Sequence, residues 1–239
     1  MRIAVVSDIH GNRTAFDAVL ADLRHTSPDL IFHGGDLADG GSSPAEIVDR
    51  IRDLGWPGVI GNVDEMLARP ESLEEFASQS TQIQPLLPAI RESAAWSREP
   101  LGPERIAWLG ALPLQQTHAG FALVHASPAS SWRSPGISAA DSELESVYAP
   151  LGKSLAVYGH IHQGFIRKLP AVTVVNTGSV SLAYDGDPRA SYLLIDNGEP
   201  QLRRVEYDIA AEVKVLHQSG HPRADWIGRM LGAAGFRMP

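Results

Sequence analysis

The sequence of 239 residues contains no cysteine. This absence excludes a disulfide framework, a thiolate nucleophile, an iron–sulfur cluster and every zinc site that uses cysteine ligands. Any metal ion that this protein binds must therefore be held by nitrogen and oxygen atoms.

Positive charge is also scarce. The chain has 20 lysine and arginine residues against 28 aspartate and glutamate residues, which gives a formal net charge of −8. A protein that wraps a long nucleic-acid duplex needs a broad basic surface to neutralise phosphates. We therefore expect no long duplex as a partner, while short oligonucleotides and nucleotides stay open as substrates.

The start of the chain lacks a long hydrophobic run. Only the residues from Ile3 to Val6 are continuously apolar before Ser7 and Asp8. This run is too short for the core of a signal peptide or for a membrane span. The sequence predicts a cytoplasmic protein that begins at Met1 and has no membrane partner, and a homodimer stays open.

The first part of the chain alternates short β-branched runs with helical patterns. Strands are predicted at residues 3–6, 30–33 and 59–60, and helices after Asn12, which is a good N-cap residue, and over 44–54. This order is typical of βαβ units, whose parallel strands present their following turns at one edge of the sheet. Ligands are expected at that edge.

The rest of the chain changes in character. Residues 65–112 combine helix formers with five prolines, which predicts a helical cap insertion within one domain spanning 1–239. Strands are predicted at 120–124 and 155–158, with hairpins over 165–176 and 191–207 that would build a second sheet packed on the first. The tail, 209–239, favours an amphipathic helix docked on the sheet over a partner surface.

Residues that can bind metal ions stand at the ends of five of the apolar runs. They are Asp8, His10, Asp36, Asn62, His125, His160 and His162. If these ends converge, carboxylate, amide and imidazole groups meet with no lysine or arginine among them, which is unstable unless cations fill the site. A mixed nitrogen and oxygen set suits Mn, Fe, Ni, Co or Zn better than Ca or Mg. Two ions that share one carboxylate fit the number of ligands.

The order of these residues resembles the signature of the calcineurin-like metallophosphoesterases. The matching pieces are Asp8-Ile9-His10, Gly35-Asp36, Gly61-Asn62, the lone His125 and Gly159-His160-Ile161-His162. The resemblance extends over residues 1 to about 207. It implies an α/β fold, a four-layer αββα sandwich of two mixed sheets flanked by helices.

The resemblance also implies a binuclear centre. Asp8, His10 and His162 would hold one ion, Asn62, His125 and His160 the other, and Asp36 would bridge them. Two cations about 3.5–4 Å apart repel each other and need a shared anionic oxygen. We expect Asp36, Asn62 and His125 to be catalytic, with Mn²⁺ as the favoured ion. The expected reaction is in-line attack of a hydroxide on a phosphate mono- or diester, without a phospho-enzyme.

One position departs from the family pattern. Many members have a histidine directly after Gly-Asn, where it is thought to stabilise the phosphate or protonate the leaving oxygen, and this chain has Val63 there. General acid assistance is typically worth about 10²–10⁴-fold in rate. We therefore predict that esters with good leaving groups, such as aryl esters and anhydrides, react best.

Several residues carry two interpretations. Asn12 either caps a helix or contacts phosphate beside the helix N-terminus, and Gly178 lies either in a loop that approaches the site or in a simple turn. Asp64 and Glu65 either orient Asn62 or another ligand, or cap the following helix. His33 is either a core residue or a neighbour of a ligand. A group of tryptophan and arginine residues either lines a substrate cleft or packs in the core: Trp96, Arg98, Trp108, Trp132 and Arg133.

Two alternative functions stay open. One is a phosphatase that acts on proteins or dinucleoside polyphosphates. The other is a non-catalytic metal-binding scaffold of the same fold, since the family includes a retromer subunit that serves as an interaction module. A scaffold is expected to lose metal ligands, whereas every metal position is filled here. The sequence does not name the physiological substrate.

Overall fold

The computed structural model describes residues 1–239, and two mixed β-sheets form its centre. The first sheet has the strand order β2-β1-β8-β9 and the second has the order β3-β4-β5-β7-β6. The strands are β1 (Arg2–Val6), β2 (Leu30–His33), β3 (Gln115–His118), β4 (Phe121–Val124), β5 (Leu155–Tyr158), β6 (Phe165–Lys168), β7 (Thr173–Asn176), β8 (Ala190–Asp196) and β9 (Glu199–Val205). The predicted pair of mixed sheets flanked by helices is confirmed.

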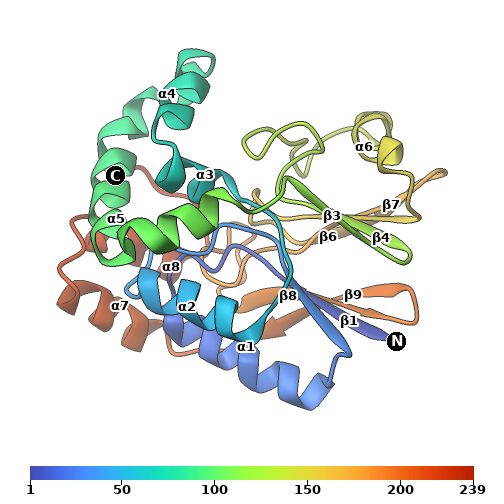
Figure 1. The fold of residues 1–239 in the computed structure, drawn as a ribbon, viewed down its shortest axis with the longest axis horizontal. Helices are drawn as coiled ribbons and strands as arrows, with labels where there is room; N and C mark the ends of the chain where they lie inside the picture. Colours follow the sequence, from blue (N-terminus) through green and yellow to red (C-terminus); the bar gives the residue numbers. More distant parts are fainter.

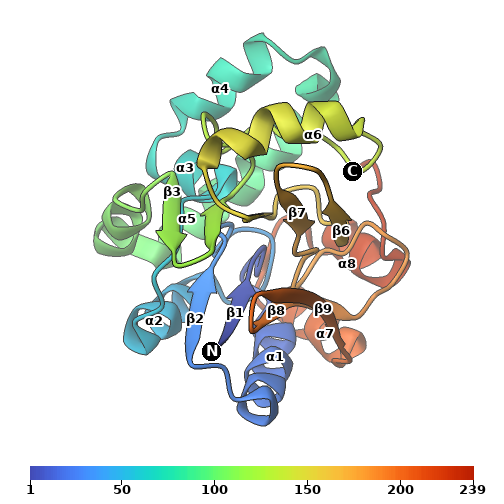
Figure 2. The same ribbon diagram turned by 90° about the vertical axis from the view of Figure 1, so that its right-hand side faces the viewer.

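Helices cover the outer faces of both sheets (Figure 1). The helices that flank the sheets are α1 (Arg13–Thr26), α2 (Pro44–Leu54) and α6 (Asp141–Tyr148), which is followed by the 3₁₀ turn η2 (Ala149–Leu151). In Figure 2, α6 lies above the two sheets and α1 below them. None of the helices in the molecule combines the length and the apolar character needed to cross a membrane.

The alternation of side chains along each strand explains how the layers pack. Ile3 and Val5 of β1 face the second sheet, while Ala4 and Val6 face the helices. Successive side chains of a strand point to opposite faces, so a strand between two layers is apolar throughout. This is why β1 has no polar position after Arg2 and is buried from Ile3 onward.

A group of helices stands at one end of the sandwich, where the ends of β1, β2, β4 and β5 also lie (Figure 1). These helices are α3 (Asn62–Ala68), α4 (Glu71–Ser78), η1 (Thr81–Leu86) and α5 (Leu87–Gly110). The run α5 contains a break at Gly102, whose φ of 62° is non-helical, between Pro100 and Pro103. The C-terminal helices α7 (Ile209–Gln218) and α8 (Ala224–Ala233) lie at the same end.

Three local predictions were wrong. The strand predicted at 59–60 is only a single bridge between His33 and Gly58, because Val59 N–H still donates to His33 O but Ile60 N–H donates to Pro113 O instead of continuing along β2. The polar strand β3 and the short helix α6 were not predicted. The tail forms two helices, because Gly220 and Pro222 interrupt the run. These helices pack on α1 and Leu182 instead of on a sheet.

Candidate metal centre

The loops that follow four parallel strands bring the metal-binding residue types together. β1 pairs with β2 in the first sheet, and β4 pairs with β5 in the second, each in parallel. The sequence analysis expected these ends along one sheet edge; the structure collects them from two facing sheets. Five of the nine non-glycine residues with positive φ are Asp8, His10, Asp36, His160 and His162, with φ between 50° and 67°. Asp and His adopt this left-handed conformation more readily than most residues.

Two glycines explain the Gly-Asn and Gly-His pairs of the motif. A Cβ atom at Gly61 would lie 2.3 Å from the backbone nitrogen of Asp36. A Cβ atom at Gly159 would lie 2.3 Å from Asp8 Oδ2. Only glycine allows these loops to approach the two carboxylates so closely.

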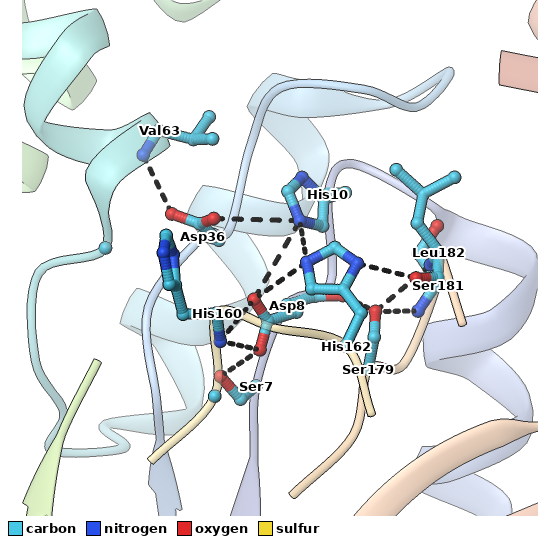
Figure 3. Close-up of polar contacts among 12 residues, drawn as sticks. Ser7, Asp8, His10, Asp36, Val63, His160, His162, Ser179, Ser181 and Leu182 are labelled. Atoms are coloured by element: carbon cyan, nitrogen blue, oxygen red, sulfur yellow. Dashed lines mark hydrogen bonds and ion pairs between the residues drawn. The ribbon is translucent and has the colours of Figure 1, made fainter. Parts of the chain in front are cut away.

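The first group of donors consists of Asp8, His10, Asp36 and His162. One ligand atom from each lies within 4.8 Å of the others, and all four residues are buried. His162 Nε2 is 3.1 Å from Asp8 Oδ1 and 3.2 Å from His10 Nε2. Figure 3 shows these side chains pointing toward one another. This group alone has the composition of a metal site.

The second group of donors is built around Asn62. Its Oδ1 atom lies 3.0 Å from His125 Nε2 and 2.8 Å from His160 Nδ1. Asp36 connects the two groups, because its Oδ2 atom is 3.7 Å from His10 Nε2 and 3.4 Å from His125 Nε2. All seven residues singled out in the sequence therefore lie in one connected cluster.

The hydrogen bonds around the cluster show that these residues suit cations. The Nδ1 atoms of His10, His125 and His162 face the carbonyl oxygens of Asp39, Gly34 and Leu182 at 2.7, 2.7 and 2.5 Å. A carbonyl only accepts, so each Nδ1 carries the proton and a neutral ring presents the lone pair of Nε2 to the cluster. Lone pairs then face one another between His10 and His162 and between His125 and Asn62. Protons or metal ions must lie between them.

Each carboxylate is anchored through one oxygen and presents the other. Ser7 Oγ donates to Asp8 Oδ2 at 2.6 Å, and Asp8 Oδ1 faces the histidines. Val63 N–H donates to Asp36 Oδ1 at 2.8 Å, and Asp36 Oδ2 lies between the two donor groups. Such supporting contacts fix the orientation of ligands in metal sites.

Asp64 supports the loops beneath the cluster. Its carboxylate accepts hydrogen bonds from the backbone N–H groups of Asp36, Leu37 and Gly61 at 2.8, 2.9 and 3.1 Å. Asp64 thus caps the N-terminus of α3 and also holds the loop of the proposed ligand Asp36 against this helix. Both interpretations of Asp64 therefore apply. Burial, with the charge of Asp36 adding to it, raises the pKa of Asp64 to about 7.

The charges inside the cluster shift several pKa values. Burial opposes ionisation of Asp36, but His125 and His10 outweigh it and hold its pKa well below the usual range. Burial also opposes protonation of His125, yet the Asp36 carboxylate outweighs it and raises the pKa of His125 to about 10. In contrast, burial and the charge of His125 lower the pKa of His160 to about 4. Without a cation, protons therefore occupy part of the cluster.

Some candidate residues lie elsewhere. Asn12 is buried, its Oδ1 accepts from Ala15 N–H at 2.9 Å as the N-cap of α1, and its Nδ2 donates to Ser181. Gly178 is also buried and donates its N–H to Asn176 Oδ1 at 3.0 Å. The Asn12 side chain and the Gly178 backbone N–H thus make contacts that stabilise the fold. His33 is buried with both ring nitrogens unpartnered, away from the cluster.

The sequence analysis did not identify two supporting residues. Ser7 orients Asp8, and Asp39 accepts the Nδ1–H of His10 through its backbone carbonyl. A serine directly before a motif carries no distinctive signal in a sequence, although Ser7 stands next to the motif residue Asp8. No sequence pattern reveals a carbonyl contact.

A model described as the calcineurin-like phosphoesterase superfamily domain matches residues 1–199. The chain belongs to this superfamily. The superfamily and the buried Asp/His group indicate a metal-dependent phosphoester hydrolase.

Similar proteins support this assignment over the whole chain. The uncharacterized protein MJ0912 of Methanocaldococcus jannaschii is 30% identical over 250 residues, which covers 96% of each chain. A metallophosphoesterase of Sphaerobacter thermophilus is 25% identical with a TM-score of 0.74, covering 98% of this chain and 100% of that chain. A hypothetical protein of Pyrococcus horikoshii, PH1004, has the same fold with a TM-score of 0.84 at 17% identity, covering 99% of both chains.

Proposed function

We propose that this chain acts as one phosphoesterase domain that hydrolyses phosphate mono- or diesters with two divalent metal ions. The proposed ligands are Asp8, His10 and His162 for one ion, Asn62, His125 and His160 for the other, and Asp36 for both. The observation that carries the proposal is the position of Asp36 Oδ2 between two groups of nitrogen and oxygen donors, with Nε2 atoms 3.7 and 3.4 Å away on its two sides. Mn²⁺ is the first ion to test, because the donor set mixes imidazole with carboxylate and amide oxygen.

The residues of the chain prepare the centre before any ion binds. The backbone carbonyls on the three Nδ1 atoms hold the rings in one tautomer, and Ser7 and Val63 N–H orient the two carboxylates. When bound, the two ions would supply a hydroxide near neutral pH and neutralise phosphoryl oxygens. Because the ions would supply the nucleophile, no side chain of the centre needs to attack phosphorus, which favours direct hydrolysis without a phospho-enzyme.

Val63 limits the choice of leaving group. Its side chain is aliphatic and lies next to the proposed ligand Asn62, where it cannot donate a proton. A basic alkoxide that leaves without a proton raises the barrier more than an aryl oxide does. We propose that aryl esters and other esters with acidic leaving groups react fastest.

The first experiment removes the metal and then restores it. Chelation should abolish hydrolysis of aryl phosphate mono- and diesters, and reconstitution with Mn²⁺ should restore it better than Mg²⁺ or Ca²⁺. Asp36→Asn should lower kcat/KM by more than about 100-fold, since even residues that only support a metal ligand cost about 10–100-fold. The control His33→Asn, also at a buried position, should change kcat/KM less than threefold. Hydrolysis that is indifferent to chelation would contradict the proposal.

Binding of the ion has a second readout that does not depend on turnover. His125 has a pKa raised to about 10, so it carries a proton at pH 8 in the metal-free protein and must lose it to become a ligand. Mn²⁺ added to weakly buffered protein at pH 8 should therefore release at least one proton per protein molecule, detected with a pH indicator. No proton release on saturation with Mn²⁺ would argue against His125 as a ligand.

A further inference from the structure

A cavity of about 200 Å³ adjoins the candidate metal centre. His10 and Asn62 form its polar end, and Val63 lies directly beside them. The remaining walls come mainly from α3, α4, η1 and α5 on one side and from α8 with Phe236, near the C-terminus, on the other. A substrate held at the centre can therefore place one of its groups between these helices.

The walls of the cavity are largely apolar. Of the 18 lining residues, 13 are hydrophobic, and none is lysine or arginine. The arginines considered earlier for a substrate cleft contact other groups: Arg98 donates to Leu67 O, and Arg133 donates to Gln79 Oε1 at 3.2 Å. Trp132 is the only one of the three tryptophans considered earlier that lines the cavity.

Most polar side-chain atoms along the apolar walls are already engaged. Trp132 Nε1 donates to Glu65 Oε2 at 3.1 Å, and Trp226 Nε1 donates to Arg237 O at 2.6 Å. The single carboxylate, Asp39, is buried and accepts from Ser93 Oγ and Ser97 Oγ at 2.8 and 2.6 Å. A nucleoside base, a sugar or a second phosphate group would lose its hydration along these apolar walls and gain few partners.

The size of the cavity limits the group that fits. An engineered apolar cavity of about 150 Å³ is enough to bind benzene. A volume of about 200 Å³ therefore accepts one aromatic ring or a short branched alkyl chain. A nucleoside, with a base and a sugar, is larger than either of these groups.

We propose that this cavity is the specificity pocket for an apolar alkyl or aryl group of the phosphoester substrate. The substrate class is then phosphate esters of small apolar alcohols or phenols. This inference rests on the proposed phosphoester hydrolysis and narrows it, because it disfavours nucleotides, dinucleoside polyphosphates and phosphoproteins.

A series of phosphonates tests the pocket without any bond being broken. Methyl-, ethyl-, propyl- and butylphosphonate are titrated against Mn²⁺-loaded protein by calorimetry, with 3-aminopropylphosphonate as the control that matches butylphosphonate in length. Burial of one methylene group is worth about 0.8 kcal/mol, which corresponds to about fourfold in Kd. Butylphosphonate should bind about 50-fold more tightly than methylphosphonate, and the aminopropyl compound should lose this gain. Equal Kd values across the alkyl series would overturn the proposal.

A pair of isoleucine variants tests whether the alkyl group of the phosphonate binds in this cavity. Ile83 lines the pocket and is half-buried, whereas Ile166 is exposed on β6 in the second sheet. Ile83→Lys should remove the dependence on chain length, and Ile166→Lys should keep it. Phe236→Lys, at an exposed position on the pocket rim, serves as a second variant if Ile83→Lys does not fold. Retention of the full chain-length dependence in a folded pocket variant would overturn the assignment of this cavity.

Turnover separates this inference from the function on which it rests. If the Mn²⁺-loaded protein hydrolyses aryl phosphates but the alkyl series is flat, the pocket assignment fails and the hydrolase function stands. If the alkyl series shows the expected slope but no phosphoester is hydrolysed with any ion, the substrate assignment fails together with the proposed function.

Discussion

Two walls with opposite chemistry meet at His10 and Asn62. One wall is the cluster of carboxylate and imidazole groups on the loops that follow β1, β2, β4 and β5, together with the amide of Asn62 at the start of α3. The other is the apolar lining from the helices over residues 62–110 and from α8. The comparison separates two tasks. The loops of the sandwich supply metal chemistry that is shared by the superfamily, whereas the helices around them choose the organic part of the substrate.

The first prediction tests the boundary between the walls at Val63. Val63→His places a titratable group beside the polar wall and should raise kcat/KM for alkyl esters by about 100-fold, because a general acid helps a basic leaving group most. Aryl esters should change little. The measurement compares alkyl and aryl esters of the same phosphoric acid. Val63→Leu is the control for size, and an unchanged ratio of alkyl to aryl rates would contradict the prediction.

The second prediction concerns the support behind the polar wall. Asp64→Asn keeps the size of the side chain but leaves only one oxygen for the three backbone N–H groups that Asp64 now accepts. The Asp36 loop should loosen, and Mn²⁺ affinity should fall by about 10–100-fold in calorimetry. Glu65→Gln is the matched control, since Glu65 contacts Ser131 and Trp132 instead. Equal affinities for both variants would remove Asp64 from the supporting role.

The third prediction uses a histidine that lies outside both walls. His33 has no partner, and burial lowers its pKa to about 3. As pH falls, the unfolded chain takes up this proton near pH 6.5 and the folded protein only near pH 3, so stability declines across that window. At pH 5 this amounts to about 2 kcal/mol.

Chemical denaturation at pH 8 and pH 5 tests the role of His33. His33→Leu should lose about 2 kcal/mol less than the parent protein between these two pH values. The control His25→Leu, at an exposed position, should follow the parent. An identical pH dependence for His33→Leu and the parent would mean that His33 is not held neutral by burial.

The smallest effect is expected at Asn12, which lies behind the polar wall. Asn12→Ala removes the N-cap of α1 and should lower the free energy of unfolding by about 1 kcal/mol. Because its side chain contacts Ala15 and Ser181, kcat/KM should stay within about threefold of the parent value. A large fall in kcat/KM with unchanged stability would restore Asn12 as a substrate contact.

The residues of the polar wall could be predicted from the sequence because each of them lies in a short local motif. Each donor follows a short apolar run directly, as Asp36 follows β2 and His125 follows β4. Parallel pairing then aligns such ends within each sheet, and the face-to-face packing of the two sheets brings both sets together. The period of apolar residues likewise predicted α1 and α2 well, since one face of each helix is buried.

The apolar wall could not be predicted in the same way. Its residues, such as Ile83, Leu86 and Met230, come from helices far apart in the sequence. Each of them is a residue type that is common in hydrophobic cores. Only the folded arrangement of α8 and the helices over residues 62–110 leaves a space among them. The two-residue run Val59-Ile60 failed for a similar reason, because a strand needs a partner and Ile60 N–H donates to Pro113 O instead of pairing with β2.

Five residues have a left-handed backbone: Asp8, His10, Asp36, His160 and His162. This conformation predicts which substitutions other proteins of this fold tolerate at these positions. Glycine and asparagine tolerate that conformation best, whereas valine or isoleucine would force the loop to rearrange. A homologue that has exchanged Asp8 or His10 for asparagine or glycine can give up ions and still keep the shape of the rim. One with a branched aliphatic residue there must have rebuilt the rim itself.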